Sequence, residues 1–435
     1  MPELRLWPRG GLWRHGDFLR LWSAETVSQL GTQVSQLALP LAAILVLDAS
    51  AFQVAFLTTV EFLPFVLLTL PAGVWVDRMR RRPILVVADL GRGLLLASIP
   101  LAHAFGQLTI WQLYVVGFGV GVGTVFFDVS YQSYLPSLVD RRQLVEGNSK
   151  LEISRSGALI AGPGLAGALV GAITAPYAIL VDALSFLGSA AFLFRIEAQE
   201  ERPERVQETS MRRELKEGLR YLLGHRYWRP FAICTASSNF FGQVGFSIFL
   251  VYAVRELDLS PQLIGLSLIP LGAGGLAAAV FAGRLSLRFG VGQTIIGAAA
   301  LFGPASLLVP LAPASHPIPF FAVSFALLGA TGIIYNITGI SLVQTITPER
   351  LLGRLNASRR FIVWGTIPLG ALTGGALASV VGLRATLFVG AIGSCLCFLP
   401  ILLSPLRKLR EMPTEQEPDP TVPRLTTTPI AGLDA

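Results

Sequence analysis

The chain has 435 residues, of which 52% are hydrophobic and only 14% are charged. Soluble domains carry roughly 25% charged residues, so a soluble fold of this length could not bury so much apolar surface. The net charge is +7, but the basic residues stand in short clusters between apolar runs, with no interleaved aromatics as in a nucleic-acid groove. We therefore expect a protein of the lipid bilayer that binds no nucleic acid.

Twelve apolar runs follow one another along the chain, each close to the length that crosses a bilayer. They cover approximately residues 18–46, 53–75, 83–104, 108–134, 149–171, 175–195, 229–254, 262–284, 291–312, 318–343, 357–380 and 383–404. The polar segment 196–228 divides them into six and six. The pattern predicts an all-α membrane protein with an N-terminal bundle at 18–195 and a C-terminal bundle at 229–405.

The placement of basic residues predicts the topology. All but three of the 34 lysines and arginines lie in the terminal segments and in alternate connectors, on one side of the membrane. The exceptions are Arg92, Arg255 and Arg384. Positive charge marks the cytoplasmic side, so both termini are expected in the cytoplasm. Lysine occurs only three times, which is typical of a GC-rich bacterial genome. The expected location is a bacterial inner membrane.

The segments outside the bundles are expected to be cytoplasmic. Residues 1–17 form the N-terminus, and residues 406–435 form a tail that is rich in Pro, Thr and Glu and is predicted to be disordered. The linker 196–228 contains MRRELKEGLRYLLGHRYW, whose helical periodicity predicts an amphipathic helix on the membrane surface.

A weak internal repeat relates the two halves. The segment from Ser137 aligns with the segment from Gln344 at a constant offset, which pairs Asn148 with Asn356 and Gly157 with Gly365. Two six-helix repeats related by an axis along the membrane normal are a transporter architecture.

The connector between the second and third spans reads GVWVDRMRRRP from Gly73 to Pro83. It resembles the G-x-x-x-D-R-x-x-R-R signature of the major facilitator superfamily. The resemblance implies a conformational latch in which Asp77 caps the positive N-terminus of the eleventh span, expected to begin near Asn356. The expected latch residues are Gly73, Asp77, Arg78, Arg81, Arg82, Arg359 and Arg360. The alternative interpretation is a solvated basic loop.

The fifth span contains GALIAGPGLAG from Gly157 to Gly167. Small residues on one helix face allow close packing of helices, and Pro163 permits a kink. The segment resembles the G-P-x-x-G signature of drug:proton antiporters in the same superfamily, carried here by Gly157, Gly162, Pro163 and Gly167. The alternative is a role in helix packing alone.

Nearly the whole chain resembles the macrolide- and siderophore-efflux branch of this superfamily, including exporters of the enterobactin type. The supporting segments are LRLWSAETVSQLGTQVSQLALPL, PAGVWVDRMRRRPILVVADLGR and FFDVSYQSYLPSLVDRRQLVEGNSKLE. The resemblance implies a monomeric exporter of amphipathic molecules, driven by proton influx. An acidic residue would be expected after Gly31, where this chain has Thr32.

Ionisable residues inside a membrane span are costly and mark functional sites. The candidates for proton coupling are Asp128 and Glu61, then Glu25, and the pair Asp89 and Arg92. Asp89 and Arg92 are spaced i,i+3 and share a helix face, which also fits a structural ion pair. Asp182, in the sixth span, also fits an interhelical hydrogen bond.

Polar and aromatic residues on the first, fourth, seventh and tenth spans are candidates for contact with substrate. They are Gln29, Gln33, Gln36, Tyr131, Asn239, Phe240, Gln243, Tyr335 and Asn336. The three glutamines follow i, i+4, i+7 and form one stripe, which could equally serve hydrogen bonding between helices. Aromatic and amide groups together favour a large, partly apolar ligand.

No catalytic constellation, P-loop lysine motif or cysteine pair with metal-ligand spacing occurs, so no enzyme, cofactor or metal is predicted. The expected energy source is the proton gradient. The leading hypothesis is efflux of drug-like molecules by alternating access. One alternative is a dedicated exporter of a siderophore or a self-made natural product. Another is a lipid-handling flippase or a membrane accessory protein.

Overall fold

The computed structural model of the chain describes residues 11–198, 200 and 211–412. Six long helices form the first half: α1 (Gly16–Leu45), α2 (Ala51–Val76), α3 (Arg81–Ala104), α4 (Ile110–Leu138), α5 (Leu144–Ile173) and α6 (Ala175–Phe194). The second half contains α8 (Trp228–Arg255), α9 (Pro261–Phe289), α10 (Val291–Leu311), α11 (Pro317–Ile346), α12 (Glu349–Val381), α13 (Leu383–Leu396) and α14 (Leu399–Leu402). Helix α7 (Met211–Gly224) lies between the halves in the chain.

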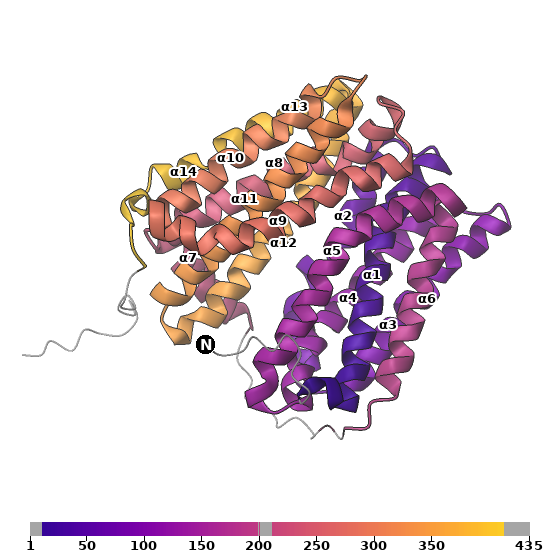
Figure 1. Cartoon of the computed structure of the whole chain (residues 1–435), viewed down its shortest axis with the longest axis horizontal. Helices are drawn as coiled ribbons and strands as arrows, with labels where there is room; N and C mark the ends of the chain where they lie inside the picture. Colours follow the sequence, from indigo (N-terminus) through magenta and orange to yellow (C-terminus); the bar gives the residue numbers. More distant parts are fainter. Residues whose placement is uncertain (1–10, 199, 201–210, 413–435) are drawn as a thin grey trace, which may run out of the picture.

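Each half is a bundle, and the two bundles are packed against each other at one end only (Figure 1). We call this the far end; it carries the α1–α2 connector and the start of α9. At the opposite end, where α6 ends at Phe194, the bundles diverge, and we call it the linker end. The described part of the chain is almost entirely helical, as the apolar runs predict.

Eleven helices of the described residues are long and apolar enough to cross a membrane. The remaining long helix, α1, has 30 residues and lies within the N-terminal bundle against α5 and α6. At 1.5 Å per residue its length of about 45 Å exceeds a bilayer core of about 30 Å. Polar residues lower its hydropathy, because it packs on protein rather than lipid. With α1 included, the described residues contain twelve helical segments long enough to cross a membrane.

Two predicted boundaries differ clearly from the structure. Helix α12 begins at Glu349, eight residues before the expected start of that span at 357, because a polar first turn is helical without being apolar. The last span is interrupted: α13 ends at Leu396 and the short α14 completes it. Gly382, with φ at +87°, separates α12 from α13 and makes this short connector possible.

Large apolar side chains are exposed around the outside of both bundles. Examples are Val87, Leu94 and Val115 in the first half and Val280 and Leu276 in the second. Contiguous exposed apolar surface of this extent is unstable in water but is suited to lipid. The outer surface therefore agrees with the composition in placing the chain in a membrane.

The far end is closed by backbone contacts between helices of different bundles. A Cβ atom added to Gly167 of α5 would lie 2.4 Å from the carbonyl oxygen of Pro261, and one added to Gly265 of α9 would lie 2.3 Å from that of Pro163. On the other side of the interface, a Cβ on Gly375 of α12 would lie 2.6 Å from the Cβ of Ala55 in α2. Glycine at these positions permits the bundles to touch.

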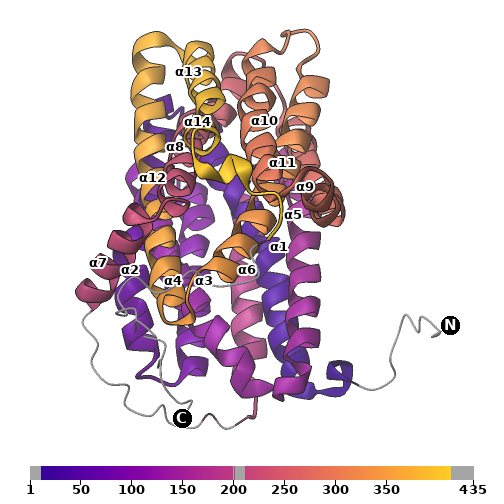
Figure 2. The same ribbon diagram turned by 90° about the vertical axis from the view of Figure 1, so that its left-hand side faces the viewer.

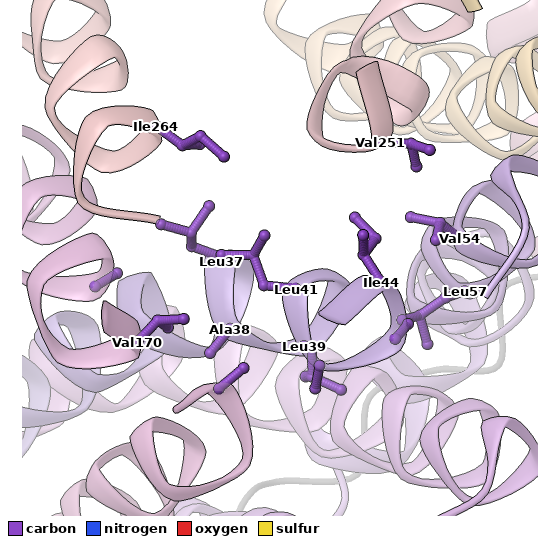
Figure 3. Close-up of a cluster of buried hydrophobic side chains, with 14 of the residues drawn as sticks. Leu37, Ala38, Leu39, Leu41, Ile44, Val54, Leu57, Val170, Val251 and Ile264 are labelled. Atoms are coloured by element: carbon purple, nitrogen blue, oxygen red, sulfur yellow. The ribbon is translucent and has the colours of Figure 1, made fainter. Parts of the chain in front are cut away.

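A buried apolar cluster continues across the same end (Figure 3). Leu37 and Leu41 of α1 lie opposite Ile264 of α9, and Ile44 lies opposite Val251 of α8. At the rim, Arg255 donates to Asp48 at 2.6 Å and to the Ala49 carbonyl at 2.9 Å. The closed far end thus has an apolar interior, and an ion pair between the two bundles lies at its edge.

Helix α7 packs against α12 near the linker end (Figure 2). Gly218 allows close approach to the Arg354 carbonyl, Glu217 forms an ion pair with Arg354 at 2.7 Å, and Leu222 is fully buried. The predicted linker helix is therefore present within Met211–Gly224, and it is anchored to the C-terminal bundle as well as being amphipathic. The predicted tail falls mainly outside the described residues.

Candidate functional site

A buried arginine is the centre of the polar interior of the N-terminal bundle. Arg92 and Asp89, one turn apart on α3, form an ion pair through Nη2 and Oδ1, as their spacing predicts, and the side chains are 5% and 0% exposed. The Arg92 guanidinium lies 4.5 Å from the ring centre of Phe127 and 4.1 Å from that of Phe186. It also donates to the Thr124 hydroxyl at 3.3 Å. Two aromatic faces and one carboxylate thus hold the cation in an apolar interior.

Carboxyl groups on other helices surround this pair. Glu25 of α1 is buried, and its Oε1 accepts a hydrogen bond from Gln29 at 2.8 Å. Its Oε2 has no partner within the described residues, and neither does Oδ2 of Asp89. Asp128 of α4 is exposed and lies within electrostatic range of Arg92 and of Arg360 on α12. The group therefore extends from the bundle interior to the surface that faces the other bundle.

The two other carboxyl groups in the spans differ from each other, because Asp182 also lies within electrostatic range of Arg92 and Asp89. Asp182 of α6 accepts a hydrogen bond from the Ser185 hydroxyl at 3.0 Å and lies against Gly31 of α1, so it serves helix packing as the sequence allowed. Glu61 of α2 packs beside Gly117 and Gly121 of α4. No charged side chain among the described residues pairs with Glu61.

The expected latch is not assembled in this conformation. Asp77 is exposed at the C-cap of α2, and no described basic residue pairs with it. Arg359 is half-buried beside the Phe231 ring, at 5.7 Å, and Arg360 is exposed, as is Arg78. A Cβ added to Gly73 would meet nothing within 4 Å, so the expected close helix approach there is absent. The reason is that α2 and α12 diverge toward the linker end.

Arg81 and Arg82 act within the N-terminal bundle instead of across the interface. The Arg82 guanidinium donates to the carbonyl of Leu193 at 3.1 Å and to that of Phe194, at the end of α6. The Glu200 carboxylate accepts from the backbone N–H of Arg81 at 2.8 Å and of Arg82 at 3.2 Å, which caps the first turn of α3. The start of the linker is thereby attached to the signature segment.

Replacing Glu200 with alanine should destabilise the protein, because it removes this cap and leaves partly buried N–H groups without a partner. Loss of an N-cap costs about 0.5–2 kcal/mol. The measurement is thermal unfolding in detergent. The matched control is Glu197→Ala, whose side chain is 82% exposed and pairs only with Arg20 among the described residues. Equal melting temperatures for the two variants would contradict the capping role.

The glycine-rich segment of α5 divides into packed and unpacked positions. A Cβ on Gly162 would lie 2.3 Å from the Cβ of Gln33 in α1, and Gly167 and Pro163 lie against α9 of the other bundle. Gly157 has open space around it, contrary to the expectation that it serves packing. The segment therefore contributes to the closed far end through its second half.

The substrate-contact candidates of the first half differ in whether their side chains are held within the bundle or exposed. Gln33 is buried against α5 and Gln29 is bound to Glu25, so these two serve contacts within the bundle, and only Gln36 of the expected stripe is exposed. Tyr131 stacks on Phe127 with ring centres 6.0 Å apart. This places it next to the Arg92 group.

The candidates of the second half separate in the same way. Asn239 and Gln243 of α8 line a cavity of about 270 Å³ inside the C-terminal bundle. Phe240 does not line it, and its carbonyl packs against Gly370 of α12. Tyr335 is stacked on Phe231 and lies 2.8 Å from the Thr235 hydroxyl, and Asn336 is exposed on α11. Only two of these five side chains meet in one cavity.

The sequence interpretation did not identify the aromatic lining of this cavity. Five phenylalanines contribute: Phe241, Phe246, Phe249, Phe302 and Phe325. They come from three helices, and phenylalanine is common throughout the spans, so no local signal distinguishes these five from lipid-facing residues. Glu200 and the Asp48–Arg255 pair were also missed, because charged loop residues are usually solvated.

Comparison with known proteins agrees with this geometry. Residues 12–428 match the family described as transmembrane secretion effector. The multidrug efflux pump Tap of Mycolicibacterium fortuitum is 26% identical over 93% of this chain and 99% of its own length. Macrolide efflux protein A of Streptococcus pyogenes is 22% identical over 90% of this chain and 97% of its own length.

A solved structure has the same fold. A bacterial homologue of the iron transporter ferroportin, in its inward-facing state, superposes with a TM-score of 0.70 at 18% identity, over 90% of this chain and 99% of that one. The same type of protein in its outward-facing state gives 0.59. Both likenesses show the shared fold.

Proposed function

Because the chain belongs to the transmembrane secretion effector family, in the efflux branch of the major facilitator superfamily, we propose that it exports amphipathic small molecules in exchange for protons. The chain is a multi-pass membrane transporter and not an enzyme. The observation that carries the proposal of proton exchange is the group of carboxyls around Arg92. It continues from the buried Glu25 to Asp128 on the surface facing the other bundle.

The proposed orientation has the linker end and both termini in the cytoplasm of a bacterial cell. Basic residues concentrate at the linker end, where Arg80, Arg81 and Arg82 begin α3 and Arg141 and Arg142 precede α5. The positive-inside rule places such clusters on the cytoplasmic side. The structure would then be open to the cytoplasm and closed to the outside.

Alternating access in this proposal is a rocking of the two bundles. The far-end contacts of Gly167 and Gly375 would separate, and α2 and α12 would approach each other at the linker end. Asp77 would then reach the N-terminal turn of α12, where a carboxylate is favoured by the helix dipole. The exposed Asp77 and Arg360 are available for this step.

Proton exchange would use a carboxyl group that attracts the Arg92 guanidinium when it is charged. A proton entering from outside neutralises Asp128, or Glu25 behind it, and so weakens its attraction to the guanidinium. Release into the cytoplasm restores the charge before the next cycle. The proton gradient is thus the proposed energy source, with no further cofactor.

We expect everted vesicles that contain the protein to accumulate an amphipathic fluorescent drug when a pH gradient, acidic inside, is imposed. An uncoupler should abolish the accumulation. Asp128→Asn should lose at least about tenfold in gradient-driven uptake, and Glu152→Gln, on the solvated start of α5, serves as the control. Uptake that is unaffected by the uncoupler would refute proton coupling, and no uptake of any compound in a broad panel would refute efflux.

A further inference from the structure

The cavity of the C-terminal bundle is large enough to hold part of a drug-sized molecule. Its volume is about 270 Å³, and a dry cavity of about 150 Å³ is sufficient to bind benzene. Five phenylalanines from α8, α10 and α11 line it, together with aliphatic side chains such as Leu271 and Leu328. Ligand sites are typically apolar cavities with a few polar groups that fix orientation.

Two amide side chains supply those polar groups. Asn239 and Gln243 lie one turn apart on α8 and line the cavity, and neither forms a hydrogen bond with the described residues. The hydroxyls of Ser306 and Ser394 line it too, but they donate to the carbonyls of Phe302 and Gly390, at 2.9 and 2.8 Å. Ser238 also lines the cavity, and its hydroxyl lies in hydrogen-bond contact with the Cys234 and Cys397 thiols. The two amides are therefore the polar groups without a partner that remain available to a ligand.

The cavity contains no counter-charge. None of its lining residues is ionisable. The sequence between residues 229 and 410 contains only three acidic residues, Glu256, Asp258 and Glu349, and all three lie at helix ends or in connectors. The carboxyl groups inside spans all belong to the N-terminal bundle. A cation in this cavity would lose its hydration without gaining a partner, which is strongly unfavourable.

We propose that this cavity binds an uncharged aromatic or apolar part of the exported molecule, oriented by the amides of Asn239 and Gln243. The two bundles thus have separate tasks: the N-terminal bundle exchanges protons, and the C-terminal bundle holds the neutral part of the substrate. That the cavity binds a neutral molecule does not depend on the proposed efflux function. That the bound molecule is also the exported one does rest on that function.

The test is equilibrium binding to the purified full chain in lipid nanodiscs, with empty nanodiscs subtracted. The probes are the neutral dye Nile red and the cationic dye Nile blue, which share a ring system. The wild type should bind Nile red at least about tenfold more tightly than Nile blue, and Gln243→Glu should reverse the preference. Gln107→Glu, in the exposed α3–α4 connector, should behave like the wild type.

A second variant addresses the volume of the cavity. Ser306→Phe should fill part of it and weaken Nile red binding about tenfold, while circular dichroism and thermal unfolding report whether the variant is folded. Equal affinity of the wild type for the two dyes would overturn the proposal. So would unchanged affinities for both dyes in Gln243→Glu and Ser306→Phe, if both variants are folded. The assay needs no gradient, so a chain that binds Nile red as expected but drives no uptake into vesicles would refute export and leave the cavity assignment standing.

Discussion

Replacing Gly167 with valine is expected to shift the protein out of the conformation described above and to remove most of its transport activity. A Cβ at this position would lie 2.4 Å from the backbone carbonyl oxygen of Pro261, and a backbone atom cannot rotate away as a side chain can. Overpacking of this kind costs about 1–3 kcal/mol. In the proposed rocking motion, α5 and α9 touch only when the far end is closed, so the penalty applies to one state alone.

A free-energy difference of that size changes the ratio of two states by about 5- to 150-fold. The measurement is electron–electron double resonance between spin labels at Gln107 and Ala314. Both residues are exposed at the far end, Gln107 in the α3–α4 connector of the N-terminal bundle and Ala314 in the α10–α11 connector of the C-terminal bundle. The distance distribution should move to longer values in the variant. Gly188→Val on α6 is the control, because a Cβ there meets nothing within 4 Å. An unchanged distribution in Gly167→Val would mean that this contact does not hold the far end closed.

Replacing Arg92 with methionine should produce the largest loss of stability. The variant leaves the Asp89 carboxylate, which is 0% exposed, without its ion-pair partner. Breaking a buried ion pair by removing one member costs about 3–5 kcal/mol, whereas replacing both members by apolar residues is often neutral. The double variant Asp89→Leu with Arg92→Met should therefore recover most of the lost stability.

Thermal unfolding of the single and double variants in detergent completes a double-mutant cycle. Arg155→Met is the control, since that side chain is 60% exposed. The double variant also separates the loss of stability from the loss of proton coupling. If coupling depends on the attraction between Arg92 and Asp128, the double variant should fold but show no uptake driven by a pH gradient. A single variant as stable as the control would show that the pair is not a structural requirement.

Some of the candidate site could be predicted because its residues are close in sequence. Asp89 and Arg92 are one turn apart, so helical geometry alone places them on the same face of α3. The rarity of carboxyl groups in apolar runs also singled out Glu25 and Asp128. Their electrostatic grouping around Arg92, and its position between the Phe127 and Phe186 rings, depend on how α1, α3, α4 and α6 pack.

The predictions that failed concerned contacts between helices that are far apart in the chain. Gly73 and Gly157 match packing signatures, yet both have open space around them in this conformation. Arg81 and Arg82 were expected to face the other bundle and are held by Glu200 and the end of α6. A sequence motif does not specify in which conformational state its contacts form.

The sequence by itself determined the membrane location, the division into two six-helix halves and the grouping of the basic clusters at one end of the helices. These follow from hydropathy and charge, which are properties of each segment and act through transfer between water and lipid. Only the tertiary structure decided which end is closed, which glycines touch the opposite bundle, and that five phenylalanines and two amides line one cavity. Those features depend on the rotation and tilt of each helix against its neighbours, which side-chain packing across distant segments determines.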